Sequence, residues 1–306
     1  MEFINFTSIV REEVEKRTGE NYKVRINDVR KNNGVILRGL TVTQDDSNIS
    51  PTIYLNDYYE DYTNGKATLV NVVNDVLDTY NRNRVNRSVD MKYFLNFECV
   101  KGKVVYKLIN AEKNKELLED IPYVKFLDLA IVFQCLISKE DLGTDTGTAT
   151  ILIHHAHLKL WDITIDELYK VAKENTQKLQ KYEIKNMHEV ICELTEAENS
   201  EDCDDMAEFE SSISMYVLSN KSRVEGAACI LYPELIKDFS NVIGSSLYII
   251  PSSIHEVLLL PSDNLDECDA IKGMIKEIND SQVKIEEVLS YSLYFYDKQK
   301  RKIIRV

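Results

Sequence analysis

Short apolar segments come in pairs along this sequence, and a tight turn joins each pair. The clearest pair is formed by residues 22–29 and 35–43, which are rich in β-branched residues and flank Asn32-Asn33-Gly34. An Asn-Gly dipeptide between such segments is a strong hairpin signal, because both residues tolerate the left-handed backbone of a tight turn. Antiparallel pairing of neighbouring strands therefore constrains the fold more than any other feature of the chain.

Helical patterns separate the strand pairs. Apolar residues at helical spacing predict helices over 3–18, 66–80, 235–243 and 264–279, and Thr164 with Glu167 fits the capping box that opens another helix. Strands are expected at 53–55, 104–109, 126–137, 148–157, 213–218 and 227–231, and hairpins at 247–260 and 292–306. A short helix is expected at 113–118.

This order of elements favours an α+β fold over a doubly wound parallel sheet, because short turns join most strand pairs and helices lie between the pairs. A chain of 306 residues is long enough for one large domain or two closely packed ones. We expect an N-terminal α+β region at 1–125 and a C-terminal α+β region at 126–306.

The charge balance limits the classes of partner. The chain carries 37 Lys and Arg against 51 Asp and Glu, a net charge of −14, so phosphate-rich surfaces would repel it on average. Nucleic-acid binding is therefore not expected, unless an acidic face mimics nucleic acid and competes for a protein that binds it. The hydrophobic share of 44% is enough for a packed core.

The eight carboxylates within residues 196–210 predict a solvated linker, since they lack both an apolar face and the ligand spacing of a calcium loop. The six cysteines are widely spaced and predict neither a zinc ribbon nor a disulfide framework. The apolar runs at 247–251 and 257–260 are too short to span a bilayer, and the N-terminus lacks the pattern of a signal peptide. We expect a cytoplasmic protein that needs neither a membrane nor a cofactor.

The first candidate site is His154-His155-Ala156-His157. On the expected strand, His155 and His157 would point to the same side and are weak candidates for metal ligands. A stable site needs a third or fourth ligand, which no spacing in the sequence supplies. The sequence therefore predicts no metal, and a pair of hydrogen-bonded histidines at a sheet edge is the favoured interpretation of the motif.

The second candidate site combines Ser252, Ser253, His255 and Glu256, which offer a nucleophile, a base and a carboxylate in a short segment. Neighbouring residues on a strand point to opposite faces, so His255 and Glu256 would not orient each other. The favoured interpretation is therefore a turn capped by serine hydroxyls, with His255 bonded to the backbone.

Several stretches resemble a known family, DUF5688, a domain-of-unknown-function family common in gut Clostridia. They include SPTIYLNDYYEDYTNG, GTATILIHHAHLKLW and SSLYIIPSSIHEVLLLP, and the resemblance covers nearly the whole chain. It implies no known activity, and it implies an association with mobile genetic elements. It also implies that His157 is the best single candidate among the histidines.

Two hypotheses about function follow from these observations. The first is a non-enzymatic interaction or regulatory protein that binds another protein, supported by the lack of a coherent catalytic set and by the Tyr-rich segment 54–62. The second is a small hydrolase or metal-dependent enzyme that uses His157 or the segment from Ser252 to Glu256. We favour the first, and the spatial arrangement of these side chains distinguishes the two.

Overall fold

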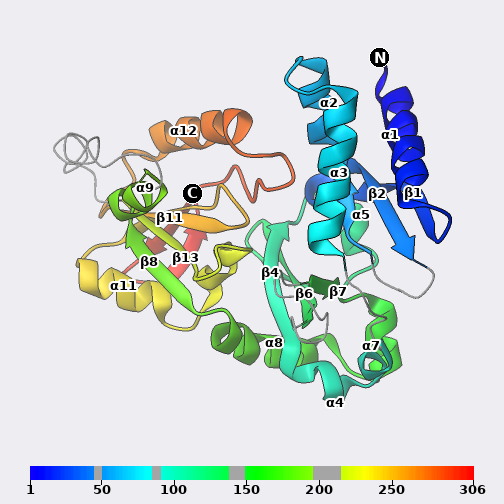
Figure 1. The fold of residues 1–306 in the computed structure, drawn as a ribbon. Coiled ribbons are helices and arrows are strands. Elements are labelled where there is room, and N and C mark those ends of the chain that lie inside the picture. Colours follow the sequence, from blue (N-terminus) through cyan, green and yellow to red (C-terminus); the bar gives the residue numbers. More distant parts are fainter. Residues whose placement is uncertain (45–49, 85–90, 138–148, 196–214) are drawn as a thin grey trace. The chain divides into compact units, whose positions relative to one another are not determined.

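A computed structural model of the chain describes residues 1–44, 50–84, 91–137, 149–195 and 215–306 (Figure 1). The described strand pairings are antiparallel, and helices alternate with the strands along the chain. The expected α+β fold class is confirmed. The chain divides into two compact units, residues 1–99 with 136–151 and residues 100–135 with 152–306.

The first unit contains a three-stranded sheet in the order β1-β2-β3, and its helices α1 and α3 share a core with that sheet. Val10 of α1, Leu40 of β2 and Val76 of α3 are completely buried in this core. The elements up to residue 100 are α1 Phe3–Thr18, β1 Tyr22–Arg30, η1 Asn32–Gly34, β2 Ile36–Gln44, β3 Thr52–Tyr54, α2 Asn56–Thr63, α3 Leu69–Asn83, η2 Met91–Leu95 and α4 Phe97–Val100.

The expected first hairpin is confirmed. Asn33 and Gly34 have φ angles of 58° and 71°, which is the left-handed conformation that Asn and Gly adopt at least cost. The helix expected over 3–18 is also confirmed, and Gly19 ends it with a φ of 89°.

A second sheet has β6 at its centre, paired with β4 and β5 and also with β7. Helix α8 packs on β4, where the buried hydroxyl Oγ1 of Thr176 accepts a 3.0 Å hydrogen bond from the backbone N–H of Tyr106. The elements of this region are η3 Lys101–Lys103, β4 Val104–Asn110, α5 Lys115–Leu118, β5 Tyr123–Phe126, β6 Leu129–Ile137, β7 Ala149–Leu152, α7 His155–Trp161 and α8 Ile165–Leu179.

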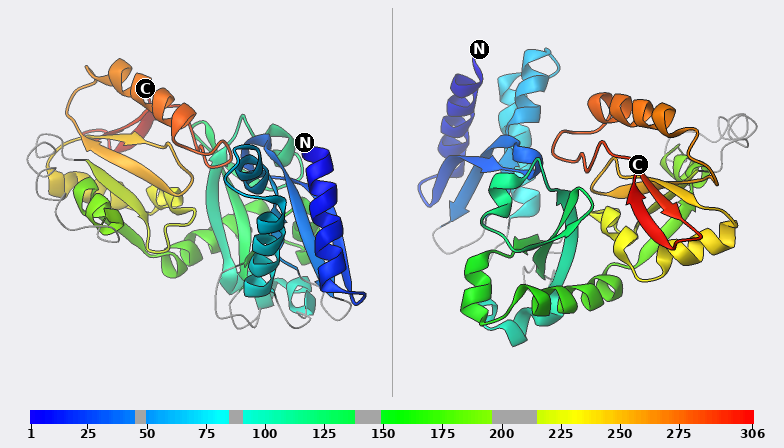
Figure 2. Two further views of the ribbon diagram at one scale, coloured as in Figure 1. Left: turned by 45° about the horizontal axis from the view of Figure 1, so that its top comes forward. Right: turned by 180° about the vertical axis from the view of Figure 1, so that it is seen from behind.

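The third sheet has six strands in the order β13-β12-β10-β11-β9-β8. Helix α12 covers one face, where Ile275 packs with Tyr248 and Phe295, and α11 lies on the other face, where Phe239 contacts Tyr216 (Figures 1 and 2). Its elements are β8 Tyr182–Asn186, α9 Met187–Thr195, β9 Tyr216–Asn220, η4 Gly226–Leu231, α11 Leu235–Ile243, β10 Leu247–Ile250, β11 Glu256–Pro261, α12 Cys268–Ser281, β12 Tyr294–Asp297 and β13 Lys302–Arg305.

Three expected strands need correction. The segment 126–137 is divided, because Leu127 adopts a φ of 53° and turns the chain from β5 into β6. The segment 227–231 is the 3-10 helix η4, which buries the small residues Ala227, Ala228 and Cys229. The strand expected over 148–157 ends at Leu152, and a helix follows.

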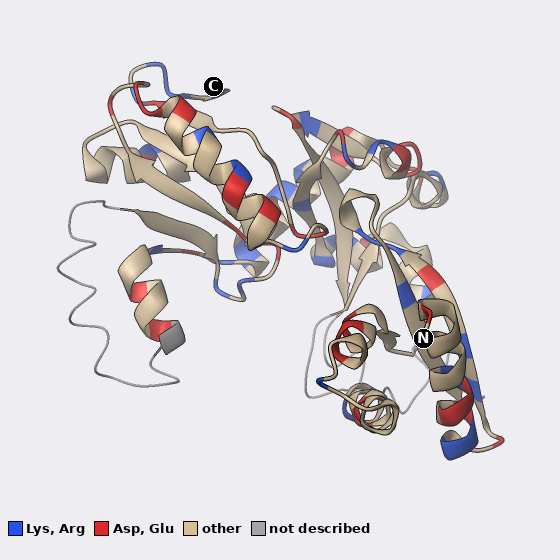
Figure 3. Ribbon diagram, turned by 90° about the horizontal axis from the view of Figure 1, so that it is seen from above, with Lys and Arg blue, Asp and Glu red and all other residues tan. Residues whose placement is uncertain are grey.

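Residues 141–147, which we expect to join the strands predicted at 126–137 and 148–157, and the acidic stretch at 196–210 lie outside the described residues. None of the helices in the described part of the chain has the length and apolar character needed to cross a lipid bilayer. Acidic and basic residues are interspersed along both α1 and α12 (Figure 3), so neither helix presents a uniformly acidic face that could mimic nucleic acid.

Candidate functional site

The histidine cluster lies at the start of helix α7 and not on a strand. His155 and His157 are therefore two residues apart on a helix, where side chains at this spacing do not face each other. His154 Nδ1 lies 2.6 Å from Asp120 Oδ2, and the backbone N–H of His154 donates to His157 Nδ1 at 3.0 Å. No group of three or more metal-ligating side chains occurs among the described residues.

The ring of His157 stacks on Trp161, with the ring centroids 5.6 Å apart. Burial, and secondarily the charge of His154, holds the pKa of His157 below its usual value. The neutral imidazole is thus favoured at the helix N-terminus, where it accepts the backbone N–H. These contacts fit a structural role that closes the first turn of α7.

The second candidate segment forms the turn between β10 and β11, and the expected hairpin is confirmed. Ser253 Oγ accepts a 3.0 Å hydrogen bond from the backbone N–H of His255, and the Ser252 carbonyl accepts one from Leu289. His255 Nδ1 accepts from the backbone N–H of Glu225 at 3.2 Å. Neither serine hydroxyl is hydrogen-bonded to the imidazole in the described contacts.

His255 belongs to a polar network on one side of the six-stranded sheet. Its Nε2 lies 3.8 Å from Glu287 Oε1, and its partner Glu225 forms a 2.6 Å ion pair with Lys107 and a hydrogen bond with Gln134. Lys107 and Gln134 come from β4 and β6, so the network ties the six-stranded sheet to the sheet centred on β6.

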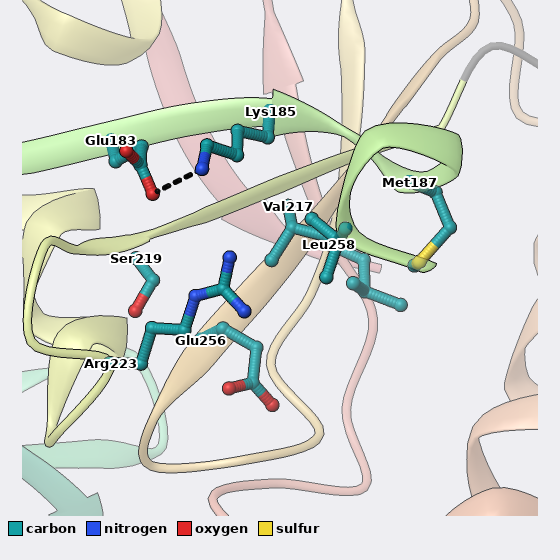
Figure 4. A pocket seen from close by; sticks show the side chains of 9 residues that line it. Glu183, Lys185, Met187, Val217, Ser219, Arg223, Glu256 and Leu258 are labelled. Carbon is teal, nitrogen blue, oxygen red and sulfur yellow. Dashed lines mark ion pairs between the residues drawn. The ribbon is translucent and has the colours of Figure 1, made fainter. Parts of the chain in front are cut away.

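Glu256 points instead into a pocket of about 290 Å³ over strands β8, β9 and β11 (Figure 4). The pocket is lined by apolar and charged side chains from these strands, from α9 and from the turn after β9. The lining residues are Glu183, Lys185, Met187, Val190, Val217, Ser219, Arg223, Glu256 and Leu258.

Strand register explains why these residues meet. Ser219 of β9 is directly opposite Glu183 of β8 and Glu256 of β11. Two residues away along β9, Val217 is opposite both Lys185 and Leu258. Because every second residue of a strand points to the same face, the two rows lie on one side of the sheet.

The cationic groups of the pocket are already paired. Lys185 Nζ lies 3.3 Å from Glu183 Oε2 and is also bonded to Glu193 of α9, and Arg223 Nη2 lies 2.6 Å from Glu193 Oε2. The hydrogen bond with Lys185, and then the one with Arg223, holds the pKa of the Glu193 carboxyl below its usual range. Glu193 is therefore an ionised link between the two cations.

The carboxylate of Glu256 has no ion pair or hydrogen bond with any residue of the described chain, although the side chain is half-buried. It lies across the pocket from the Glu183–Lys185 pair (Figure 4). A carboxylate that is partly removed from water without a partner loses hydration and gains nothing in return. A ligand in this pocket would thus give the Glu256 carboxylate the hydrogen-bond or ion-pair partner that it lacks among the described residues.

The turn that carries Arg223 is held in an uncommon conformation. Arg223 and Glu225 have φ angles of 53° and 55°, in the left-handed region. The buried side chain of Asn220 stabilises this turn, because its Nδ2 donates to the Val224 carbonyl at 2.8 Å and its Oδ1 accepts from Ser222 Oγ at 2.9 Å. The turn sends Arg223 to the pocket and Glu225 to the network of His255.

Comparison with known proteins gives the family but no activity. The profile of a family of unknown function, DUF5688, matches residues 3–298. The chain belongs to this family. DUF5688 thus covers both compact units and every residue of the pocket, and the resemblance noted from the sequence is confirmed. No curated protein and no solved structure matches the sequence significantly.

Sequence reasoning did not find most of this pocket. It singled out Glu256, but the strand β8 and the helix α9 were not anticipated. The alternation of Tyr182, Glu183, Ile184 and Lys185 is the one local signal that predicts a strand with charges on a single face. His157 and His255, which the sequence offered in two separate candidate sites, have no contact residue in common among those described above.

Proposed function

We propose that this protein acts by binding another protein and not by catalysis, and that the pocket over β8, β9 and β11 is where the partner binds. The observation that carries this proposal is the lining of the pocket. An apolar surface from Val217, Leu258 and Val190 lies next to the unpaired carboxylate of Glu256. Such a combination binds a ligand by burial and fixes its orientation by charge.

The geometry gives less support to the hydrolase alternative. A serine nucleophile needs an imidazole within hydrogen-bond reach, about 3 Å from its oxygen. Ser253 Oγ instead accepts from a backbone N–H, and His255 Nδ1 accepts from the backbone N–H of Glu225. The contacts of Ser253 and His255 are those that hold a turn together.

The same proposal places the protein in the cytoplasm. Cys99, Cys229 and Cys268 form no disulfide in the described chain. Free cysteines on several elements are typical of proteins kept in a reducing compartment.

The test is quantitative affinity capture from the native host, followed by binding measurements with the purified recombinant partner. Charge reversal in the pocket with Glu256→Arg should weaken that binding by about tenfold or more, because it replaces the free carboxylate with a bulky cation. The matched control is Glu189→Arg on α9, an exposed residue that does not line the pocket, and it should bind like the wild type.

Two results would contradict the proposal. One is partner binding that survives Glu256→Arg unchanged, which would move the binding site elsewhere. The other is turnover of an ester, amide or phosphoester substrate that disappears in a folded Ser253→Ala or His255→Ala protein. That result would establish the hydrolase alternative.

A further inference from the structure

The charged side chains in and beside the pocket over β8, β9 and β11 include one more carboxylate than cations, and the unpaired carboxylate is that of Glu256. Its two cations, Lys185 and Arg223, are both bonded to Glu193, and Lys185 also lies 3.3 Å from Glu183. With Glu256 the local set has three carboxylates and two cations. Glu256 is the carboxylate left over, and it has no partner among the described residues.

Apolar surface continues directly from this carboxylate. Leu258 lies two residues from Glu256 on the same face of β11, and Val217 is opposite Leu258 on β9. Met187 and Val190 of α9 face the same space. A ligand that satisfies Glu256 therefore has to carry an aliphatic chain behind its cationic group.

The volume of the pocket limits the classes of ligand that it can hold. Its volume of about 290 Å³ is at the lower limit of small-molecule pockets, which begin near 300 Å³. A nucleotide or a cofactor with several rings needs more room than this. A single long side chain with a charged end matches both the volume and the lining.

We infer that the pocket binds a lysine or arginine side chain of a partner polypeptide, with its aliphatic stem on Val217 and Leu258 and its cationic end on Glu256. The inference rests on the proposed function and specifies which chemistry the partner presents. A polypeptide source is favoured over a free amine because apolar side chains flanking the cation would contact Met187 and Val190 at the rim formed by α9.

The experiment uses two peptides that differ only in the cation. One is acetyl-Leu-Lys-Leu-amide, and the other has norleucine in place of lysine, which keeps the aliphatic chain and removes the ammonium. The readout is the ¹³C-methyl resonance of Met187 in methionine-labelled full-length protein. The six methionines are few enough for Met187→Leu to assign that resonance.

The lysine peptide should shift the Met187 methyl resonance saturably, and the norleucine peptide should not. Glu256→Gln should weaken the affinity for the lysine peptide about tenfold, because a charge-assisted hydrogen bond is lost. Glu189→Gln removes the same charge from an exposed position of α9 and should leave the affinity unchanged.

A third ligand, 1,4-diaminobutane, separates a polypeptide source from a free amine. Tighter binding of the diamine than of the peptide would overturn the polypeptide source. Equal binding of the lysine and norleucine peptides would overturn the role of Glu256. If neither peptide binds while Glu256→Arg still abolishes partner capture, the ligand class is wrong and the proposed binding function stands. If partner capture is also unaffected, both proposals are overturned.

Discussion

His255 and Glu256 are neighbours in sequence but take part in different structures. His255 precedes β11 and accepts a hydrogen bond from the turn after β9, whereas Glu256 is the first residue of β11 and lines the pocket. The separation arises because β11 begins at Glu256, whose side chain shares a face with Leu258, while His255 lies in the bend before the strand. The segment from Ser252 to Glu256 resembles a catalytic motif in sequence, but its His and Glu side chains take part in two unrelated sets of contacts.

The contacts of His255 make its contribution measurable. His255→Ala should lower the free energy of unfolding by about 1 kcal/mol, since the Glu225 N–H loses its acceptor in a partly buried position. Ser252→Ala should change it little, because only the backbone of Ser252 is hydrogen-bonded in the described contacts. Denaturant unfolding of both variants measures the difference. A fully stable His255→Ala protein that no longer binds its partner would show that His255 is functional.

Asp128 is a second residue with a defined role. Burial alone would raise the pKa of its carboxyl, but hydrogen bonds from Ser290, Tyr294 and Ser292 outweigh burial and hold the pKa below its usual value. The donors are 2.6 Å, 2.6 Å and 3.0 Å from the Asp128 oxygens. The ionised carboxylate therefore joins the β5–β6 turn to the C-terminal strands.

This lowered pKa predicts a dependence of stability on pH. The stabilisation is complete above the unfolded-state pKa of about 3.9 and is lost as the pH falls through the lower folded-state value. Asp128→Asn should thus be less stable than the wild type at neutral pH, and the difference should shrink in acid. Urea midpoints measured across acidic pH would show this. A difference that stays constant down to acid pH would mean that the charge of Asp128 does not matter.

At the level of elements, η4 depends on a close approach between backbones. An added Cβ on Gly226 would overlap Ser219 Oγ and lie only 2.5 Å from the His255 carbonyl and 2.6 Å from the Asn220 nitrogen. Two of these neighbours are backbone atoms that cannot move independently of β9 and β11. Gly226 is required here because no side chain fits, and not because of its φ angle.

Gly226→Ala should therefore destabilise the protein by about 1–3 kcal/mol or more, as overpacking a closed site does. The matched control is Gly273→Ala within α12, where an added Cβ meets no atom within 4 Å. That change should stabilise the protein by about 0.5–1 kcal/mol, because alanine is the better helix former. Thermal unfolding of both variants tests the pair. Equal stability of the two would mean that η4 can move away from β9.

The start of α8 shows an element that the sequence defines locally. Thr164 Oγ accepts from the Glu167 N–H at 3.3 Å, and Glu167 Oε2 accepts from the Thr164 N–H at 2.8 Å. The expected capping box is confirmed, and both groups that form it lie within four residues of the sequence. No distant contact is needed for this helix to begin where it does.

For the whole molecule, the sequence predicts that the protein needs no metal, because the His155–His157 spacing supplies too few ligands. This prediction is still to be tested. Elemental analysis of the purified, tag-free protein should find zinc, iron and manganese far below one equivalent. Near-stoichiometric zinc that is lost in a His155→Ala, His157→Ala double variant would contradict it.

The sequence alone determined the features that depend on a few consecutive residues. The Asn33-Gly34 turn, the stop of α11 at Gly244 and the cap of α8 each follow from the backbone preferences of the residues that form them. The antiparallel α+β class follows from the same kind of information, because tight turns leave adjacent strands no other way to pair.

The tertiary structure alone decided the pocket. Glu183, Ser219 and Glu256 are brought side by side by the order β11-β9-β8, and no local pattern specifies which strand lies beside which. Tertiary contacts also determine that α7 begins at His155 and that η4 is a 3-10 helix, since by composition the same residues fit a strand. The physical reason is that strand order and close packing depend on burial between residues far apart in the chain, which the periodicity of a single segment does not encode.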